Sequence, residues 1–413
     1  MKFNRSYSVF SIVVALLLVG MIVSPGLSQS RRQPPSSNEK KNKRPGETPK
    51  PGDQQQEPLP PDLVPTKPQD LEKVTISTQI VNVDAVVYHK KSGQIVANLK
   101  KPNFAIFDNG VQQEITNFST PEAPITVAMV VEYSKLSDYF GYASTRGYEP
   151  GFYEVIRPTA MFLSQFIKPP DDFVSVVAFD IRPTPLTDFT NDPSRLQSVI
   201  SLLLRNSPAF RETNLFDALK FVLVGGRGDS VVLEESKDAK SDYAGLVSVQ
   251  GRRRAVVLVA SGIDTFSKIN YGDARKVLQN SGIPVYIIGT AGMYKKVYAD
   301  QLPATDGLLG TPGRMTWLQA DNTLNTFAKE TGGAYFPVTF EGELPKVLNS
   351  INALLRSQYS LAFNPGDVKD GKQHKLQVKV DVDGDGTYDD KEFVVQARQY
   401  YNSPKPEKDG DKK

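Results

Sequence analysis

An apolar run of β-branched residues ends at a carboxylate, and two hydroxyl groups follow at once. The run is 126–131 in the stretch TVAMVVEYSKLS, and Glu132, Ser134 and Ser137 come directly after it. Five or six apolar residues between polar ones are typical of a strand buried on both faces of a parallel sheet. Ligands of open α/β sheets collect at the carboxyl ends of such strands, and oxygen ligands suit Mg²⁺. The stretch therefore predicts a cation site; the alternative is a strand end capped by polar loop residues.

A second set of oxygens lies near the end of the chain. Positions 1, 3, 5, 6, 9 and 12 of a loop are occupied by Asp381, Asp383, Asp385, Gly386, Asp389 and Glu392. An EF-hand loop wraps Ca²⁺ with this spacing. The flanks 375–380 and 392–398 alternate like strands, so the loop is predicted to join two strands of a β-hairpin. Clustered carboxylates repel one another without a cation, which favours Ca²⁺ over the alternative of an acidic turn.

Catalytic motifs do not fit this sequence. His89 and His374, the two histidines, fall in predicted β segments, and we expect them to be exposed strand or turn residues, since no nucleophile or orienting carboxylate is paired with either. A nucleophile elbow, a P-loop and a dinucleotide-binding fingerprint are all absent from the sequence. The chain is therefore expected not to be an enzyme.

Strands alternate with amphipathic helices from Ile125 onward. Predicted strands are 126–131, 173–179, 255–260, 285–288 and 334–336, and predicted helices are 153–167, 194–204, 215–224, 271–281, 322–329 and 344–356. Such alternation implies an α/β fold, a doubly wound and mainly parallel sheet with helices on both faces. The polar stretch 225–251 has few apolar anchors and is predicted to be a mobile loop.

Antiparallel β segments flank this region. Residues 74–88 alternate apolar and polar positions, and Asp108-Asn109-Gly110 is a hairpin signal between the strands 104–107 and 111–118. Because domain termini often lie close together, we expect the N-terminal and C-terminal β segments to pack into one unit.

Three segments of the α/β region resemble the metal-site segments of the von Willebrand factor type A domain. They are 127–137, 212–219 (ETNLFDAL) and 256–264 (VVLVASGID). The flanking β segments look like those of exported A-domain-related proteins of acidobacteria, so that the resemblance covers residues 74–401. It implies a Rossmann-like A-type domain that acts as a protein-binding or adhesion module. An alternative is a structural or assembly component of the cell envelope, with the A-like domain as a metal-free scaffold.

The resemblance also implies a ligand set. The family's metal-ion-dependent adhesion site uses an Asp-x-Ser-x-Ser loop, a Thr from a second loop and an Asp from a third. Here Glu132 stands at the first Asp, Ser134 at the first Ser and Thr213 at the Thr. These matches imply a Mg²⁺ site.

Two positions of that set are altered further. The second Ser is Leu136, with Ser137 one residue later, and the last Asp is Ser261, with Asp264 three residues further on. Mg²⁺ demands near-ideal octahedral geometry, so a vestigial site that still shapes a recognition surface is the alternative.

The N-terminus has the pattern of a secretory signal. Lys2 and Arg5 precede an apolar core, Val9 to Val23, and Gly26-Leu27-Ser28 follows as a small-residue cleavage site. We predict cleavage after residue 28 and an exported, periplasmic, envelope or extracellular protein; an uncleaved membrane anchor is the alternative. The chain has no Cys, which excludes disulfides.

The predicted organisation follows from these patterns. Residues 29–72 hold ten of the 30 prolines and almost no aromatic residue, which is typical of a disordered linker. The predicted divisions are 1–28 signal, 29–72 linker, 73–122 N-terminal β segment, 123–357 A-like domain, 358–401 C-terminal β segment and 402–413 disordered tail. With 49 basic and 46 acidic residues, the chain shows no preference for nucleic acid. A protein ligand is expected, contacted by the Tyr- and Gly-rich stretch 139–153, unless those aromatic residues are core.

Overall fold

The structure, a computed structural model, describes residues 80–405 except 122, 145–146, 230–239, 251, 299, 308–309 and 367. The predicted signal and linker lie outside the described residues. In the part of the chain that is described, no helix is both long enough and apolar enough to cross a membrane.

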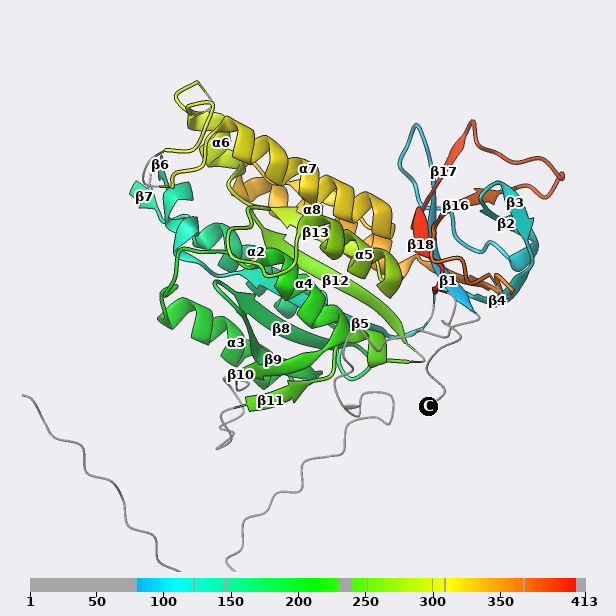
Figure 1. Ribbon diagram of the computed structural model, residues 1–413, viewed down its shortest axis with the longest axis horizontal. Coiled ribbons are helices and arrows are strands. Elements are labelled where there is room, and N and C mark those ends of the chain that lie inside the picture. Colours follow the sequence, from blue (N-terminus) through cyan, green and yellow to red (C-terminus); the bar gives the residue numbers. More distant parts are fainter. Residues whose placement is uncertain are drawn as a thin grey trace, which may run out of the picture. The chain divides into compact units, whose positions relative to one another are not determined.

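A six-stranded sheet forms the centre of the α/β region (Figure 1). Its strands are β5 (Ile125–Glu132), β8 (Phe173–Phe179), β9 (Pro183–Thr190), β12 (Arg253–Ala260), β13 (Val285–Gly289) and β14 (Tyr335–Pro337), in the order β14-β13-β12-β5-β8-β9. Every pairing is parallel except that of β8 with the edge strand β9. The sheet is doubly wound and mainly parallel, so the predicted fold class is confirmed.

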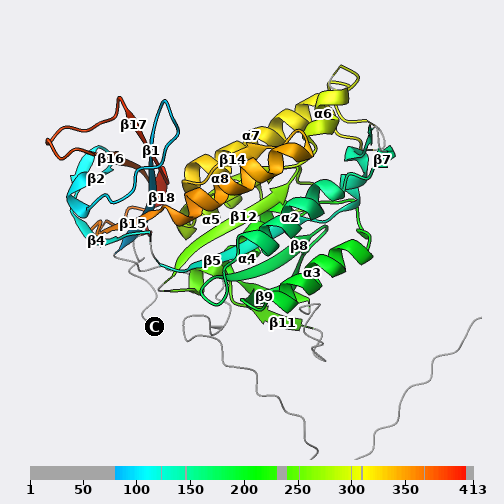
Figure 2. The same ribbon diagram turned by 180° about the vertical axis from the view of Figure 1, so that it is seen from behind.

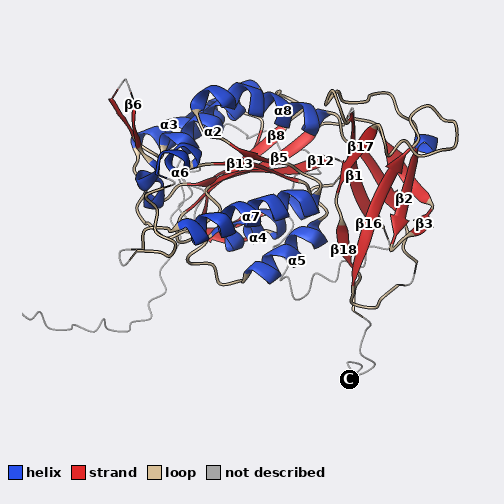
Figure 3. Ribbon diagram, turned by 90° about the horizontal axis from the view of Figure 1, so that it is seen from above, coloured by secondary structure: helices blue, strands red, loops and turns tan. Residues whose placement is uncertain are grey.

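Helices cover both faces of this sheet (Figures 2 and 3). They are α2 (Tyr153–Gln165), α3 (Pro193–Arg205), α4 (Leu215–Val224), α5 (Tyr271–Ser281), α7 (Arg314–Thr331) and α8 (Leu344–Arg356). The short helix α6 (Gly292–Tyr298) has no buried residue and contributes to neither apolar cluster on the sheet. Along β5, Ala128 and Val130 face α4, α5 and α7, whereas Val127, Met129 and Val131 face α2, α3 and α8. Because successive strand residues point to opposite faces, an almost wholly apolar strand is buried on both.

Two antiparallel sheets form a separate β unit. One has the order β17-β1-β15-β4 and the other β18-β16-β2-β3. The strands are β1 (Val81–His89), β2 (Phe104–Asp108), β3 (Val111–Gln113), β4 (Ile115–Ser119), β15 (Tyr359–Phe363), β16 (Gln373–Val380), β17 (Phe393–Ala397) and β18 (Tyr400–Asn402). Both sheets contribute to one apolar core. The N-terminal and C-terminal segments therefore pack together, as the sequence predicts.

Several elements differ from the prediction. The strand expected at 111–118 is divided at Glu114, because β3 pairs with β2 whereas β4 pairs with β15 of the other sheet. Strand β9 was not predicted because it begins with Pro183 and Pro185, residues that a sheet tolerates at its edge. The disordered tail is wrongly predicted to start at 402, since Asn402 belongs to β18 and Ser403 is buried.

Within the stretch 225–251, the described residues on either side of 230–239 form two strands, which the prediction of a loop did not include. Strands β10 (Gly226–Asp229) and β11 (Lys240–Tyr243) pair within it. Tyr243 is buried against Phe221, and its hydroxyl lies 2.6 Å from the Ser175 hydroxyl. Tyr243 thus anchors one end of the stretch 225–251 in the core. The polar composition of the stretch gives no sign of this anchor.

Candidate functional site

The strand order reverses direction between β5 and β12. The chain passes from β5 to β8 on one side, and later adds β12, β13 and β14 on the other. In open α/β sheets, ligands bind outside the carboxyl ends of the strands at such a switch point. Glu132 ends β5 and Ser261 follows β12, so both residues lie at this point.

Glu132 is buried and faces Ser261. Its carboxylate accepts hydrogen bonds from the Ser261 main-chain N–H (2.7 Å) and from the Ser261 hydroxyl (2.8 and 3.0 Å). Burial raises the pKa of Glu132 to about 7, and the hydrogen bonds from Ser261 oppose this rise only in part. Glu132, at the position of the family's first Asp, is thus hydrogen-bonded to Ser261, at the position of the family's last Asp.

The hydroxyls of Ser134 and Ser137 are buried without a hydrogen-bond partner among the described residues. The Ser134 hydroxyl is close enough to Glu132 to favour its charged form, but it lies outside hydrogen-bond geometry. Ser137 belongs to a short 3₁₀ helix, Lys135–Phe140. Leu136, at the second Ser position, packs in an apolar cluster that includes Phe140.

Thr213 and Asp264 have partners of their own. The Thr213 hydroxyl donates to the Ile263 carbonyl at 2.8 Å. Asp264 accepts from the Leu215 main-chain N–H at 2.9 Å, and so caps the first turn of α4. It also accepts from the Ser267 hydroxyl at 2.5 Å. The three loops meet as the resemblance implies, but these two side chains hold the loops together through the protein's own donors and acceptors.

This donor set does not fit a Mg²⁺ ion. Asp264 accepts from Leu215 and Ser267, so Glu132 is the predicted carboxylate ligand left at the switch point, and each of its oxygens already accepts from Ser261. Leu136, at the second Ser position of the adhesion-site loop, has an apolar side chain that cannot coordinate a metal ion. The Ser134 and Ser137 hydroxyls are neutral, whereas Mg²⁺ is usually held through carboxylates in near-ideal octahedral geometry, and the switch point offers no free carboxylate oxygen pair for it.

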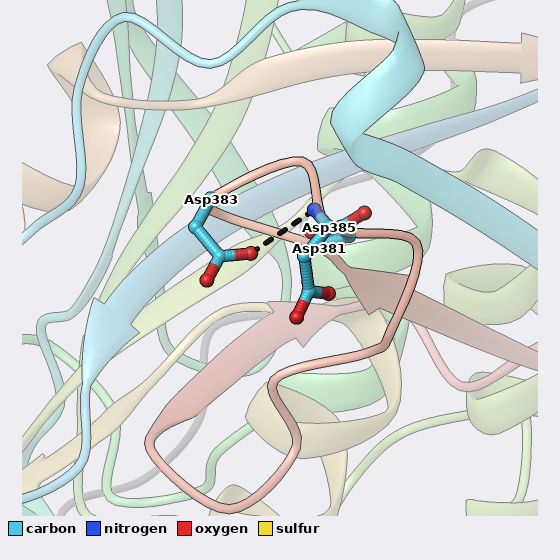
Figure 4. A group of neighbouring side chains, drawn as sticks. All are labelled: Asp381, Asp383 and Asp385. Atoms are coloured by element: carbon cyan, nitrogen blue, oxygen red, sulfur yellow. Dashed lines mark hydrogen bonds between the residues drawn. The ribbon is translucent and has the colours of Figure 1, made fainter.

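The hairpin loop brings three carboxylates together (Figure 4). One oxygen from each of Asp381, Asp383 and Asp385 lies within 4.8 Å of the others. Asp381 accepts from the main-chain N–H groups of Gly384 (2.7 Å) and Gly386 (2.8 Å). Two hydrogen bonds from Thr387 lower the pKa of Asp385. The bond from the Thr387 hydroxyl has the larger effect, and the bond from the Thr387 main-chain N–H has the smaller one. The expected repulsion is therefore offset by donors within the loop.

The other two predicted ligands are not in this group. Asp389 accepts from the Val382 main-chain N–H at 2.7 Å. Glu392 is exposed, and its own N–H donates to the Asp389 carbonyl. The loop joins two strands, β16 and β17, as predicted, and Ca²⁺ binding stays a prediction.

His374 is not the exposed residue that was expected. It is 7% exposed, and its Nδ1 lies 2.9 Å from an Asp108 oxygen, while its Nε2 lies 3.3 Å from Asp370. The Tyr401 hydroxyl donates to Asp108 at 2.6 Å. Asp108 belongs to β2, Tyr401 to β18 and Asp370 to the loop before β16. Because β2 and β18 are apart from His374 in the sequence, the residues next to His374 do not predict the cluster.

Exposed aromatic side chains lie on the loops around the switch point. Tyr139, Phe210 and Phe266 are 41%, 45% and 55% exposed. Within the predicted contact stretch 139–153, Tyr148 is also exposed, whereas Phe140 is core. Sequence analysis missed Phe210 and Phe266; the available signal was a lone aromatic residue in each polar loop beside Thr213 and Asp264.

Comparison with known proteins gives only distant similarities. No family model matches the chain, and no curated protein matches it. The PilB minor pilin from Streptococcus sanguinis is 14% identical, with a TM-score of 0.38, over 59% of this chain and 63% of that one. This chain thus spans less than two thirds of the pilin.

Two further solved structures are similar at the same level. An aerotolerance-related membrane protein from Bacteroides fragilis is 16% identical, with a TM-score of 0.35, over 56% of this chain and 97% of that one. Proximal thread matrix protein 1 from the mussel byssus, in a structure with a zinc-occupied MIDAS motif, is 12% identical, with a TM-score of 0.34, over 59% and 48%. Similarity at this level identifies no ligand or partner for this chain.

Proposed function

We propose that this chain is an exported, A-domain-like module that binds a protein partner through the loops at the carboxyl edge of its central sheet. The observation that supports this is the set of exposed aromatic side chains there, Tyr139, Phe210 and Phe266. We call these three residues, together with Arg211, the edge surface. Aromatic residues and Arg are enriched in protein interfaces, and exposed apolar groups gathered in one place are typical of them.

Contacts between the loops support the edge surface as one unit. The Arg211 guanidinium lies over the Tyr139 ring, 4.4 Å from its centroid. The Lys135 main-chain N–H donates to the Phe210 carbonyl at 2.6 Å, and that of Phe266 donates to the Thr213 carbonyl at 2.9 Å. The loop after β5, the loop before α4 and the loop after β12 are thereby joined.

Burial favours binding over catalysis. Glu132 and Thr213 are at most 1% exposed, so neither can touch a substrate in this conformation. His374 is enclosed in the β unit between two carboxylates. The exposed residues above the switch point include Tyr139, Phe210 and Phe266, which are aromatic and do not supply a nucleophile with its base.

A structural or assembly role in the cell envelope is the second candidate. The β unit favours it, because both flanks of the A-like domain are used to build a second module. Under this role the A-like domain is a scaffold, and single changes on its edge surface should have little effect on assembly.

Matched variants can separate these roles. The full-length chain is immobilised, and saturable binding of proteins from the producing organism's envelope is measured for Phe266→Ala, Phe210→Ala and Leu204→Ala. Leu204, on α3, is 53% exposed and matches Phe266 in exposure. We expect a tenfold or greater loss of affinity for the two edge variants, roughly the effect of truncating an interface anchor. Equal affinities for all three variants would contradict the proposal.

A further inference from the structure

We infer that the pair Glu132–Ser261 replaces the cation at the switch point, so that the edge surface is held in place without any metal ion. This inference rests on the proposed function only in naming the surface that is held. The two residues are 129 positions apart, and their hydrogen bonds join the end of β5 directly to the start of the loop after β12.

The length of the side chain makes the direct link possible. Glu has one methylene more than Asp, and here the carboxylate reaches the neighbouring strand end, where it accepts from both Ser261 N–H and Ser261 Oγ. Ser at 261 is a donor, whereas a carboxylate there would repel Glu132. The two substitutions therefore complement each other. A Glu–Ser pair makes the bond directly, whereas two carboxylates would repel each other unless a cation or a shared proton lay between them.

The third loop is tied in the same manner. The Thr213 hydroxyl donates to Ile263 O, and the Thr213 carbonyl accepts from the N–H groups of Thr265 and Phe266. Asp264 binds the N-terminal turn of α4 through the N–H of Leu215. All three loops of an adhesion-type site are thus linked by hydrogen bonds between protein groups.

The unpaired hydroxyls do not require a cation. Besides Ser134 and Ser137, the described residues have two other buried side-chain atoms without a partner, Thr290 Oγ1 and Trp317 Nε1. Trp317 packs with Leu136 and Ala291, beside Thr290, at this edge of the sheet. An unpaired buried group of this kind is therefore no sign of a cation, because an indole N–H can only donate and water can pair with each of these four groups.

The first test measures Mn²⁺ binding by electron paramagnetic resonance in the full-length chain. We expect the unaltered chain and Thr213→Ala to bind the same number of ions, and Asp385→Ala to remove any ion held by the hairpin. In the Asp385→Ala chain, the combined change Glu132→Asp, Leu136→Ser and Ser261→Asp rebuilds the family's ligand set and should gain one Mn²⁺. Loss of one ion on Thr213→Ala alone would overturn the inference.

A second test does not depend on the folding of the rebuilt variant. In the Asp385→Ala chain, the melting temperature should be the same in Mg²⁺ and in chelator. Ser261→Ala should lower it by about 2–4 °C per kcal/mol lost, equally in both solutions. A melting temperature that Mg²⁺ raises and Thr213→Ala returns to the chelator value would overturn the inference.

Partner binding distinguishes the two proposals. If binding is lost in chelator in the Asp385→Ala chain but still depends on Phe266, the metal-free link is wrong and the edge surface stands. If binding ignores Phe266 while Mn²⁺ stays unbound at the switch point, the edge surface is wrong and the metal-free link stands.

Discussion

The two acidic regions of this chain stabilise their carboxylates in different ways. At the switch point, one buried carboxylate, Glu132, takes its donors from Ser261, 129 positions away. In the hairpin, Asp381, which is 9% exposed, and Asp385, which is exposed, take their donors from the next few residues. Glu132 is therefore stabilised by a contact between distant parts of the chain, whereas Asp381 and Asp385 are stabilised by contacts within one turn. Acidic spacing alone therefore does not reveal whether a metal ion is required.

The largest expected effect is at the buried carboxylate. Glu132→Ala leaves a cavity and removes the acceptor of two Ser261 donors, which should lower the free energy of unfolding by about 4 kcal/mol at pH 5. Urea unfolding measures it. Glu132→Gln, which keeps the size and one acceptor oxygen, is the control and should cost about 1 kcal/mol. If Glu132→Ala lowers the free energy of unfolding by less than about 1 kcal/mol, the hydrogen bonds between Glu132 and Ser261 contribute little to stability.

The pH dependence of stability should have opposite signs in the two regions. The pKa of Glu132 is raised to about 7 from an ordinary 4.5, so the folded chain binds more protons between these values. Its contribution is present below pH 4.5 and is lost as the pH rises through 7, by about 3 kcal/mol. Asp385, whose pKa is lowered, contributes above its ordinary pKa and loses that contribution in acid.

Unfolding between pH 2 and 8 checks this difference, because the contribution of Asp385 is lost only below its ordinary pKa of 3.8. Glu154, which accepts from the Ala291 N–H and whose pKa burial also raises to about 7, adds a loss of the same sign as Glu132. Glu132→Gln should therefore flatten the curve in part, and adding Glu154→Gln should flatten it further. A curve that Glu132→Gln leaves unchanged would mean that this carboxylate is ionised in the folded chain.

Calcium should act on the hairpin alone. An ion that binds only the folded loop stabilises it by about 2.7 kcal/mol at a hundredfold excess over the dissociation constant. Millimolar Ca²⁺ should raise the melting temperature, Asp385→Ala should remove most of the rise, and Glu132→Ala should leave it intact. Mg²⁺ should substitute poorly, because the larger ion suits a flexible loop. Identical curves in Ca²⁺ and in chelator would reduce the loop to an acidic turn.

The smallest expected effect is at Asp264. Because it caps α4 through the Leu215 N–H, Asp264→Ala should cost about 1 kcal/mol, the usual value of a helix cap. Thermal unfolding in Mg²⁺ and in chelator measures it. If Asp264→Ala lowers stability only in the presence of Mg²⁺, Asp264 is a metal ligand and not a helix cap.

The sequence predicts the parts of this fold that depend on local pattern. The apolar run before Glu132 gives the central strand, and the spacing of Asp381, Asp383 and Asp385 gives the acidic loop. The link from Glu132 to Ser261 depends on the order of the strands, which periodicity does not reveal. His374 shows the same limit, since both of its carboxylate partners are identified only by the pairing of β2 and β16 and by a turn.

Exposure is the second property that pattern does not reveal. Phe140 and Tyr139 are neighbours in the chain, yet one is core and the other lies on the surface. Both fit the same Tyr- and Gly-rich stretch, and the 3₁₀ turn they share decides which side chain points inward.

The pairing of β1 with β15 sets an order of events during synthesis. Asp84 and Ser360, which meet across these strands, are 276 positions apart. Strand β1 emerges first and can complete its sheet only when nearly the whole chain has followed it. Such distant contacts slow folding and leave strand edges open to wrong pairing in the interval. A chain truncated before β15 would leave β1 without either of its neighbours, β15 and β17, so translation that stops early should yield an aggregating product.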